Sequence, residues 1–503
     1  MAHVPLTRRR LLKKAGAAAT ALAAIDAPLT TAAYAAARKR RTADVVVVGA
    51  GFSGLAAARA LHKAGHDVVV LEARDRVGGR TDNARIANGR YVVELGGEYV
   101  GPTQDRILAL AKAVGVKTFP VYNAGSNVLI ANGQRTLYPA ATGLPDDPGL
   151  VHSLQVLVQL DAIGKEVGVQ APWKSKNARK YDGQTLAQWL APQGITPDAM
   201  AIVDAICESV WGADPEELSL LYVAMYTAAA GDAKTPGSFF KLISTAGGAQ
   251  ERRFDGGSVL VAQKVAQQLG SRVILKAPVT KIKDHDDTVT VTTRGGPTVV
   301  AKQAIVAVPP VLATRIAFAP GLEADKKTLL KAMVPGSLTK VEAVYDTPFW
   351  RAAGLSGQGV SDAGLACVPY DNSPPDGGVG VFFGFIGGKR HAEWVALDAA
   401  TRRARVLDDF VRFTADERAR SPLEIVEKDW TTETWTRGCP VGHFAPGVLS
   451  KHGAALRAPH GRVHFAGTET SDYWLGYMDG AVRAGERAAQ EAAAALRVRH
   501  PKT

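Results

Sequence analysis

Three glycines near the start of the chain have the spacing of a phosphate-binding turn. Gly49, Gly51 and Gly54 form the pattern GxGxxG, directly after the apolar segment 44–48 and before the Ala-rich segment 55–63. We expect a strand, a tight turn and a helix, in which the glycines let the backbone turn, approach a pyrophosphate and pack the helix on the strand. The unpaired N–H groups at the helix N-terminus would bind the anion. The dinucleotide contacts predicted in this turn are Gly49, Gly51, Phe52, Ser53 and Gly54.

An acidic residue follows where a dinucleotide site needs one. Glu72 ends a second apolar segment, 67–71, about 20 residues beyond the glycines, and its carboxylate can accept hydrogen bonds from ribose hydroxyls. The segment 73–80 (ARDRVGGR) adds two glycines and Arg80, a charge-assisted donor for the pyrophosphate. This segment resembles the second glycine signature of the FAD-dependent amine oxidases, so FAD is favoured over NAD. The contacts predicted here are Glu72, Ala73, Arg74, Gly79 and Arg80.

The resemblance extends along nearly the whole chain, from about residue 44 to about residue 494. Four separated blocks resemble those of the flavin-containing monoamine oxidases and occur in the family's order, which is far more specific than a lone glycine motif. The blocks are 94–104 (ELGGEYVGPTQ), 248–257 (GAQERRFDGG), 334–350 (VPGSLTKVEAVYDTPFW) and 465–489 (FAGTETSDYWLGYMDGAVRAGERAA). The resemblance implies a mixed α/β fold, with a Rossmann-like FAD-binding lobe and a discontinuous substrate-binding lobe.

The patterning of the chain agrees with two interleaved lobes. Segment 150–230 is predicted to be helical, whereas 272–308 contains short β-like runs such as 288–292. A chain of 503 residues also exceeds the size at which a single core stops growing, roughly 250–300 residues. From the resemblance we expect FAD-binding pieces at 44–118, 246–329 and 432–495, and substrate-lobe pieces at 119–245 and 330–431.

The resemblance implies two catalytic residues, Lys340 and Tyr477. Lys340 matches the lysine that holds a water against the flavin N5, and we expect burial to lower its pKa and suit it to proton transfer. Without the surrounding motif, a lysine among alternating apolar residues would be read as a solvated strand residue. Tyr477 matches one wall of the family's aromatic sandwich, but Pro440 stands where the animal enzymes have the second tyrosine. Substrate preferences of the animal enzymes therefore do not transfer.

Cys439 matches the cysteine through which animal monoamine oxidases bind the flavin 8α carbon. The thiol either forms this thioether or only packs against the flavin, and the sequence leaves both open. The resemblance also places further residues around the cofactor, with Tyr99 lining the substrate cavity as well. These are Gly96, Gly97, Glu98, Tyr99, Val279, Trp430, Gly467, Glu469, Tyr477 and Met478.

These residues together favour an enzyme that oxidises a small primary or secondary amine and reduces oxygen to hydrogen peroxide, with the flavin supplying the redox chemistry. An L-amino acid oxidase would need a cation, usually an arginine, for the substrate carboxylate. Arg106 and Arg252 match basic residues that monoamine oxidases also have. A diamine or polyamine oxidase would need an acid for the distal ammonium, and Glu98 is a candidate. A flavin-binding protein that has lost its activity is the alternative outside the enzymes.

The first residues of the chain resemble a twin-arginine export leader. Thr7 to Lys13 (TRRRLLK) is followed by an Ala-rich apolar stretch and small-residue cleavage sites, and we expect the leader to span residues 1–37. The mature protein would then be periplasmic or extracellular. Beyond the leader no apolar run of about 18 residues occurs, so we expect no membrane anchor.

The charge and the cysteine content of the chain limit the kinds of binding partner that we expect. The leader contains five cationic side chains and one anionic side chain, which leaves +8 of the formal charge of +12 on the remainder. No basic run interleaved with aromatic residues follows the leader, so nucleic acid is not expected as a partner. Three scattered cysteines, Cys207, Cys367 and Cys439, do not form a disulfide framework or a zinc motif, and no metal site is expected. The oligomeric state stays open, with a homodimer as one candidate.

Overall fold

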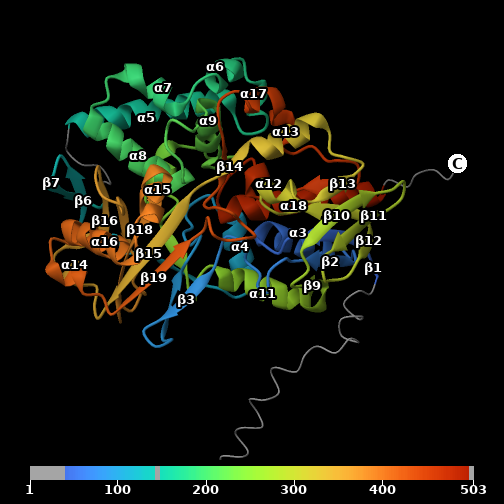
Figure 1. Ribbon diagram of the computed structural model, residues 1–503, viewed down its shortest axis with the longest axis horizontal. Helices are drawn as coiled ribbons and strands as arrows, with labels where there is room; N and C mark the ends of the chain where they lie inside the picture. Colours follow the sequence, from blue (N-terminus) through green and yellow to red (C-terminus); the bar gives the residue numbers. More distant parts are fainter. Residues whose placement is uncertain (1–39, 142–147, 498–503) are drawn as a thin grey trace, which may run out of the picture.

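A mixed eight-stranded sheet forms the first lobe of the computed structural model, which describes residues 40–141 and 148–497 (Figure 1). The strand order is β13-β10-β11-β12-β1-β2-β9, and β21 pairs with β12. β1 is parallel to both β12 and β2, as in a Rossmann-like sheet. The strands are β1 (Arg41–Val48), β2 (Val68–Leu71), β9 (Val273–Ile274), β10 (Val279–Asp284), β11 (Val289–Thr293), β12 (Val299–Val306), β13 (Ala317–Ala319) and β21 (Val463–Phe465).

Burial on both faces explains the continuous valine runs of the central strands. Residues 45–48 of β1 and all of β2 are buried, since helices cover the sheet and leave no solvated face. α3 packs against α18, and α11 packs against α3. The two helices α3 and α18 approach closely, because a Cβ on Gly485 would lie 2.1 Å from the Ser53 carbonyl oxygen. The helices of this lobe include α3 (Phe52–Lys63), α4 (Asp105–Ala113), α11 (Val259–Leu269), α12 (Pro310–Ala313), α13 (Ala324–Ala332) and α18 (Met478–Arg497).

A second lobe is built on a four-stranded antiparallel sheet with the order β17-β18-β15-β19. Every residue of β15 is buried, because β15 is paired on both edges and covered on both faces. β6, β7 and β16 form a separate three-stranded sheet beside it. The strands are β6 (Ser126–Ala131), β7 (Gln134–Pro139), β15 (Leu338–Tyr345), β16 (Leu355–Ser361), β17 (Val368–Asp371), β18 (Gly380–Gly387) and β19 (Glu424–Asp429).

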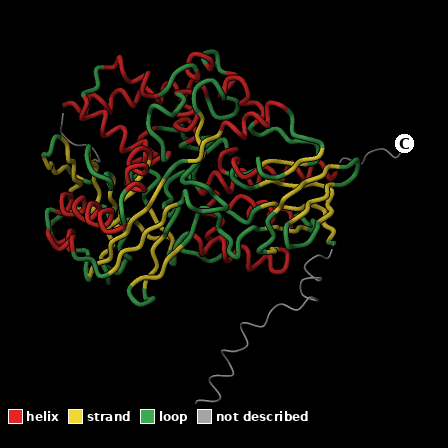
Figure 2. Tube along the Cα trace, viewed as in Figure 1, coloured by secondary structure: helices red, strands yellow, loops and turns green. Residues whose placement is uncertain are grey.

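Figure 2 shows the strands gathered in two groups, toward the left and the right of the view, with a helical region above the left group. Helix α9 lies within this region against α5 and is apolar around nearly its whole circumference, as expected for a helix inside a core. The helices here are α5 (Pro148–Val167), α6 (Ala178–Asp182), α7 (Leu186–Leu190), α8 (Pro197–Trp211), α9 (Leu220–Ala229) and α10 (Phe239–Ile243). The remaining elements are β3 (Asn83–Ile86), β4 (Tyr91–Glu94), β5 (Thr118–Pro120), β8 (Arg252–Phe254), β14 (Met333–Pro335), β20 (Gly442–Phe444), α14 (Phe349–Ala352), α15 (Gly388–Ala396), α16 (Ala399–Thr414) and α17 (Leu449–His452).

The expected fold class is confirmed: a Rossmann-like lobe stands beside a second lobe that is inserted between its pieces. The helical prediction for 150–230 is confirmed by α5 to α9, and the β prediction for 272–308 by β9 to β12. Among the helices of the described residues, none has the length and apolar character needed to cross a bilayer. The predicted export leader at 1–37 lies outside the described residues.

Candidate active site

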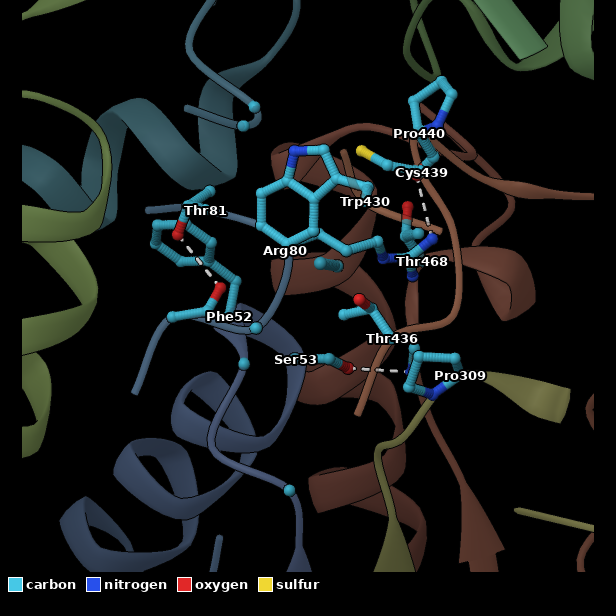
Figure 3. A pocket seen from close by; sticks show the side chains of 18 of the residues that line it. Phe52, Ser53, Arg80, Thr81, Pro309, Trp430, Thr436, Cys439, Pro440 and Thr468 are labelled. Carbon is cyan, nitrogen blue, oxygen red and sulfur yellow. Dashed lines mark hydrogen bonds between the residues drawn. The ribbon is translucent and has the colours of Figure 1, made fainter. Parts of the chain in front are cut away.

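One large cavity brings together residues from both lobes, and Figure 3 shows part of its lining. At one end lies the turn between β1 and α3, where two glycines are sterically required. Gly49 has a φ of +101°, and a Cβ on Gly54 would lie 1.9 Å from the Gly49 carbonyl oxygen. The N-cap residue of α3 is Gly51, which has no side chain to cap the helix. The first N–H groups of α3 therefore stay available to an anion. This end of the cavity therefore suits a pyrophosphate.

The carboxylate of Glu72 is fixed at the end of β2. Its Oε2 accepts from the backbone N–H of Ala50 at 2.7 Å, and its Oε1 accepts from the backbone N–H of Arg74 at 2.9 Å. Each oxygen keeps a second lone pair, and Glu72 lines the cavity together with Val279. The arrangement suits the hydroxyls of an adenosine ribose.

Arg80 is held by protein groups on one side. Its guanidinium donates to both carboxylate oxygens of Glu469, at 2.7 and 3.1 Å, and to the carbonyl oxygen of Pro440 at 2.9 Å. Burial alone would lower the pKa of Arg80, but the Glu469 carboxylate outweighs it and the pKa is raised. Arg80 lines the main cavity, whereas Glu469 lines a smaller neighbouring one. The ion pair thus positions the segment that follows Cys439.

Trp430 and Cys439 lie together at the other end of the cavity (Figure 3). The Trp430 indole N–H donates to the Leu95 carbonyl oxygen at 2.7 Å, which fixes the ring beside the 95–97 loop. Gly96 must lack a side chain, because its Cβ would lie 2.7 Å from the Trp430 ring and 2.2 Å from the Arg80 carbonyl oxygen. Burial raises the pKa of the Cys439 thiol to about 12, so the thiol is neutral at physiological pH.

Lys340 lies on β15 within a buried group of carboxylates. Its ammonium donates to the Glu94 carbonyl oxygen at 2.6 Å and lies 2.9 Å from Glu98 Oε2 and 3.1 Å from Glu342 Oε1. The same nitrogen is 4.1 Å from the centre of the Phe383 ring. The Glu94 carbonyl is thus the hydrogen-bond acceptor of the ammonium, whereas Glu98 and Glu342 are its ion-pair partners.

The predicted net lowering of the Lys340 pKa is wrong. Burial does act in that direction and is the largest single influence, but the carboxylates of Glu342, Glu98 and Glu94 together outweigh it, and the pKa is raised. Lys340 is therefore a permanent cation at physiological pH. The sequence shows only one of these carboxylates near Lys340, that of Glu342 two positions on along the same strand, because Glu94 and Glu98 lie about 240 positions away along the chain.

Arg253, on β8, completes this group, which we call the Lys340 cluster: Glu94, Glu98, Arg253, Lys340 and Glu342. Arg253 Nη2 donates to Glu94 Oε2 at 2.6 Å, and its Nε lies 3.9 Å from Glu98 Oε2. Burial raises the pKa of Glu98 to about 7, against the opposing effect of Lys340. Glu342 also has a raised pKa, again from burial. All the side chains of the cluster are at most 3% exposed.

Aromatic rings form much of the cavity wall near Lys340. Tyr477 donates its hydroxyl to the Leu242 carbonyl oxygen at 3.3 Å, and its ring lies 6.1 Å from Tyr226 and 5.0 Å from Trp474. Tyr226 lines the cavity together with Tyr477. Pro440 lines the cavity, as the sequence predicts. The cavity therefore has one firmly braced tyrosine and a proline where the animal enzymes have two tyrosines.

The structure brings nearly all the predicted site residues to this one cavity. Two are not in its lining: Gly54, which acts through packing beneath the turn, and Glu469, which holds Arg80. The lining residues from the predicted set are Gly49, Gly51, Phe52, Ser53, Glu72, Ala73, Arg74, Gly79, Arg80, Gly96, Gly97, Glu98, Tyr99, Val279, Lys340, Trp430, Cys439, Gly467, Tyr477 and Met478.

Other lining residues were missed by the sequence analysis. Thr81 and Thr436 neighbour predicted residues and could have been included on that ground. Ser209 and Val210 on α8 and Tyr226 on α9 carry no recognisable signal, since they belong to helices whose apolar pattern indicates only a core. Phe385, Trp435 and Arg315 were also missed.

This lining fits FAD. The glycine turn, Glu72 and the 78–80 loop would hold the dinucleotide half, while Gly97, Trp430, Cys439 and Met478 would surround the flavin ring. Bound FAD supplies a hydride acceptor, and the residues around it position the substrate and exclude water.

Comparison with known proteins agrees with this architecture. The family model described as flavin containing amine oxidoreductase matches residues 52–493, and a pyridine nucleotide-disulphide oxidoreductase model matches 10–89. A chain of Mycobacterium tuberculosis, named as a flavin-containing monoamine oxidase, is 40% identical over 90% of this chain and 97% of its own. The flavin-containing amine oxidase B of Sus scrofa is 38% identical over 89% of this chain and 85% of its own.

Solved structures of amine oxidases have the same fold as this chain. A structure of putrescine oxidase bound to putrescine superimposes with a TM-score of 0.85 at 34% identity, covering 91% of this chain and all of the other. Cyclohexylamine oxidase from Brevibacterium oxydans IH-35A also gives a TM-score of 0.85 at 34% identity, covering 90% of this chain and 99% of its own. The fold and the site thus define an FAD-dependent oxidoreductase that acts on amines. The chain belongs to the flavin-containing amine oxidoreductase family.

Proposed function

We propose that this enzyme oxidises small monoamines that lack a carboxylate and transfers the electrons to oxygen, forming an imine and hydrogen peroxide. The observation that carries the proposal is the state of the cations in the cavity lining. Lys340 is enclosed by Glu98 and Glu342, Arg80 is paired with Glu469, and Arg74 is paired with Glu433 at 2.9 Å. Arg315 also lines the cavity, and we assign it to the nucleotide half because its chain neighbour Ile316 packs in the core of the FAD-binding sheet. A substrate carboxylate would therefore have to compete with a protein carboxylate.

The aromatic wall supports the same substrate class. Tyr477 and Tyr99 would contact the alkyl or aryl part of the amine, and the face of an aromatic ring attracts the ammonium on its way in. Braced rings hold the substrate in one orientation, which lowers the entropic cost of reaching the reactive geometry. The absence of a second tyrosine at Pro440 leaves room for a broader substituent on that side.

The test is peroxide release by the purified mature protein, with tyramine, phenethylamine, benzylamine, putrescine, spermidine and several L-amino acids as substrates. We expect turnover of monoamines. Turnover of amino acids alone would replace the proposal with an L-amino acid oxidase, and turnover of putrescine alone would favour a diamine oxidase. Bleaching of the flavin by an amine without oxygen separates an enzyme from an inactive flavin-binding protein.

We further propose that Cys439 forms a thioether to the flavin 8α carbon. The thiol and the 8α methyl group each lose one hydrogen, and oxygen takes up both as hydrogen peroxide. Cys439 lines the flavin end of the cavity beside Trp430, and its position matches the linking cysteine of the animal enzymes. Acid precipitation should leave the yellow colour with the wild-type protein and release it from a Cys439→Ser variant. Colour that is released equally from both proteins would show that the flavin is held without a covalent bond.

Export through the twin-arginine pathway is the last part of the proposal, and it rests on residues 1–37 alone. A folded flavoprotein suits this pathway, because the cofactor must be captured before export. Replacing Arg8, Arg9 and Arg10 with lysine should keep the protein in the cytoplasm, as measured by cell fractionation. Unchanged export of this variant would refute the assignment. The N-terminal sequence of the exported protein would define the cleavage site.

A further inference from the structure

The charges of the Lys340 cluster do not balance. Glu94, Glu98 and Glu342 supply three carboxylates, whereas Lys340 and Arg253 supply two cations. The cluster is buried, and an uncompensated charge in such a place is costly unless a further charge or a proton neutralises it. With every acid ionised, the cluster would hold one excess negative charge.

The excess charge lies at Glu98 and Glu342. Glu94 is engaged by Arg253 at 2.6 Å, which leaves the other two acids to share the single ammonium of Lys340 at 2.9 and 3.1 Å. Both side chains are 1% exposed, so an ammonium group of a ligand has no room beside them. A proton needs no such room. Lys340 and Glu98 both line the cavity, so this proton lies at the border of the substrate site.

We propose that Glu98 and Glu342 share one exchangeable proton beside Lys340, and that this pair is the proton store of the amine-oxidising cavity. Once the pair has given up this proton, it can accept the one that the substrate ammonium loses before oxidation, and it returns that proton when oxygen becomes hydrogen peroxide. Overall, RCH2NH3+ and O2 give RCH=NH2+ and H2O2, with no net proton released or consumed. A store for one proton is therefore sufficient for each turnover. This inference rests on the proposed amine oxidation.

The surroundings of Glu98 support a proton that can leave and return. Burial raises the pKa of Glu98 to about 7, with Lys340 and Arg253 acting against it and Glu94 and Glu342 acting with it. Tyr99 and Tyr370 complete the groups that face it, and burial holds their own pKa values far above neutrality. Lys340 stays charged, so the titrating proton belongs to the carboxylates.

Infrared spectroscopy of the oxidised holoenzyme tests the proton directly, without substrate. We expect the carbonyl stretch of a protonated carboxylic acid, which disappears as the pH rises through about 7. Glu98→Gln and Glu342→Gln should each abolish this titrating band, because either change removes the excess negative charge and lets the remaining acid ionise. Glu98→Asp keeps the charge and should keep the band.

Glu208 provides the matched control. It is a buried glutamate whose pKa burial raises to about 8, and it pairs with Arg390 at 2.8 Å outside the cavity lining. The band of Glu98 should persist in Glu208→Gln. Glu208 should contribute a band of its own that titrates near pH 8 and is lost only in Glu208→Gln. If the difference spectra between the wild type and Glu98→Gln or Glu342→Gln contain no titrating band, the proposal is overturned.

The pH profile of anaerobic flavin bleaching tests the role of the proton in the reaction. The bleaching rate of the wild type should rise as the pH increases through about 7. This rising limb of the pH profile should be absent from Glu98→Gln and present in Glu98→Asp. A purely structural role of Glu98 would lower the stability and leave the limb in place, which would refute the storage role. If no amine bleaches the wild-type flavin, amine oxidation itself fails, while the infrared result still decides whether the proton exists.

Discussion

Replacing Gly54 with alanine should weaken FAD binding by a predictable amount. The new Cβ would lie 1.9 Å from the Gly49 carbonyl oxygen and 3.2 Å from Val47. Since heavy atoms in ordinary contact are about 3.5 Å apart, α3 must move away from the turn by about 1.6 Å. Overpacking of this kind costs about 1–3 kcal/mol. The turn holds the pyrophosphate, so we expect this strain to appear as a loss of FAD affinity of about 5- to 140-fold.

The assay is titration of the apoprotein with FAD, followed by the change in flavin fluorescence. Gly321→Ala is the matched control, because a Cβ at Gly321 meets no atom within 4 Å. The control should bind FAD as the wild type does. Equal affinities for Gly54→Ala and the control would refute the view that close packing beneath the turn shapes the pyrophosphate site.

Substitutions at three residues test other parts of the site. Tyr477→Phe loses only the hydrogen bond to Leu242 and should lower kcat/KM less than tenfold, since such a bond contributes about 1 kcal/mol. Tyr477→Ala removes the whole aromatic wall and should lower kcat/KM more. Steady-state kinetics measures both effects. Glu72→Ala should weaken FAD binding by about 10- to 100-fold, measured by the same titration, because a hydrogen bond to a charged group contributes about 1.5–3 kcal/mol. The pKa of Glu98 is raised from 4.5 to about 7, so its protonated form stabilises the folded state below pH 4.5 and this contribution is lost as the pH rises to 7. Glu98→Gln should therefore show a smaller fall in Tm over this interval than the wild type; equal falls would contradict the assignment.

The sequence predicts the dinucleotide half of the site well, because that half is made by local geometry. The turn around Gly49 and Gly51, with Glu72 at the end of the next strand, follows from one strand-turn-helix unit and its neighbour. Each of these residues has a role that its own backbone position defines. The fold class was implied by the family resemblance, and the alternation of valine-rich and helical segments agrees with it.

The catalytic half is not predictable to the same degree, because it depends on side chains that meet only in the folded chain. The pKa of Lys340 is raised rather than lowered, since Glu342 on the same strand is joined by Glu98 and Glu94, which come from β4 and the loop after it. Arg80, expected to contact the pyrophosphate, is paired with Glu469 nearly 400 residues away. Tyr226 reaches the cavity from a helix whose sequence indicates only a buried core.

The sheet of the FAD-binding lobe has a consequence for biosynthesis. β12 pairs with β1 from the beginning of the chain and with β21, near its end, while α18 closes over α3 (Figure 1). Because synthesis proceeds from the N-terminus, this sheet cannot be completed until β21 has left the ribosome, more than 400 residues after β1. No nascent fragment that lacks α18 has a finished nucleotide pocket. Completion of the flavin pocket therefore waits for the synthesis of α18.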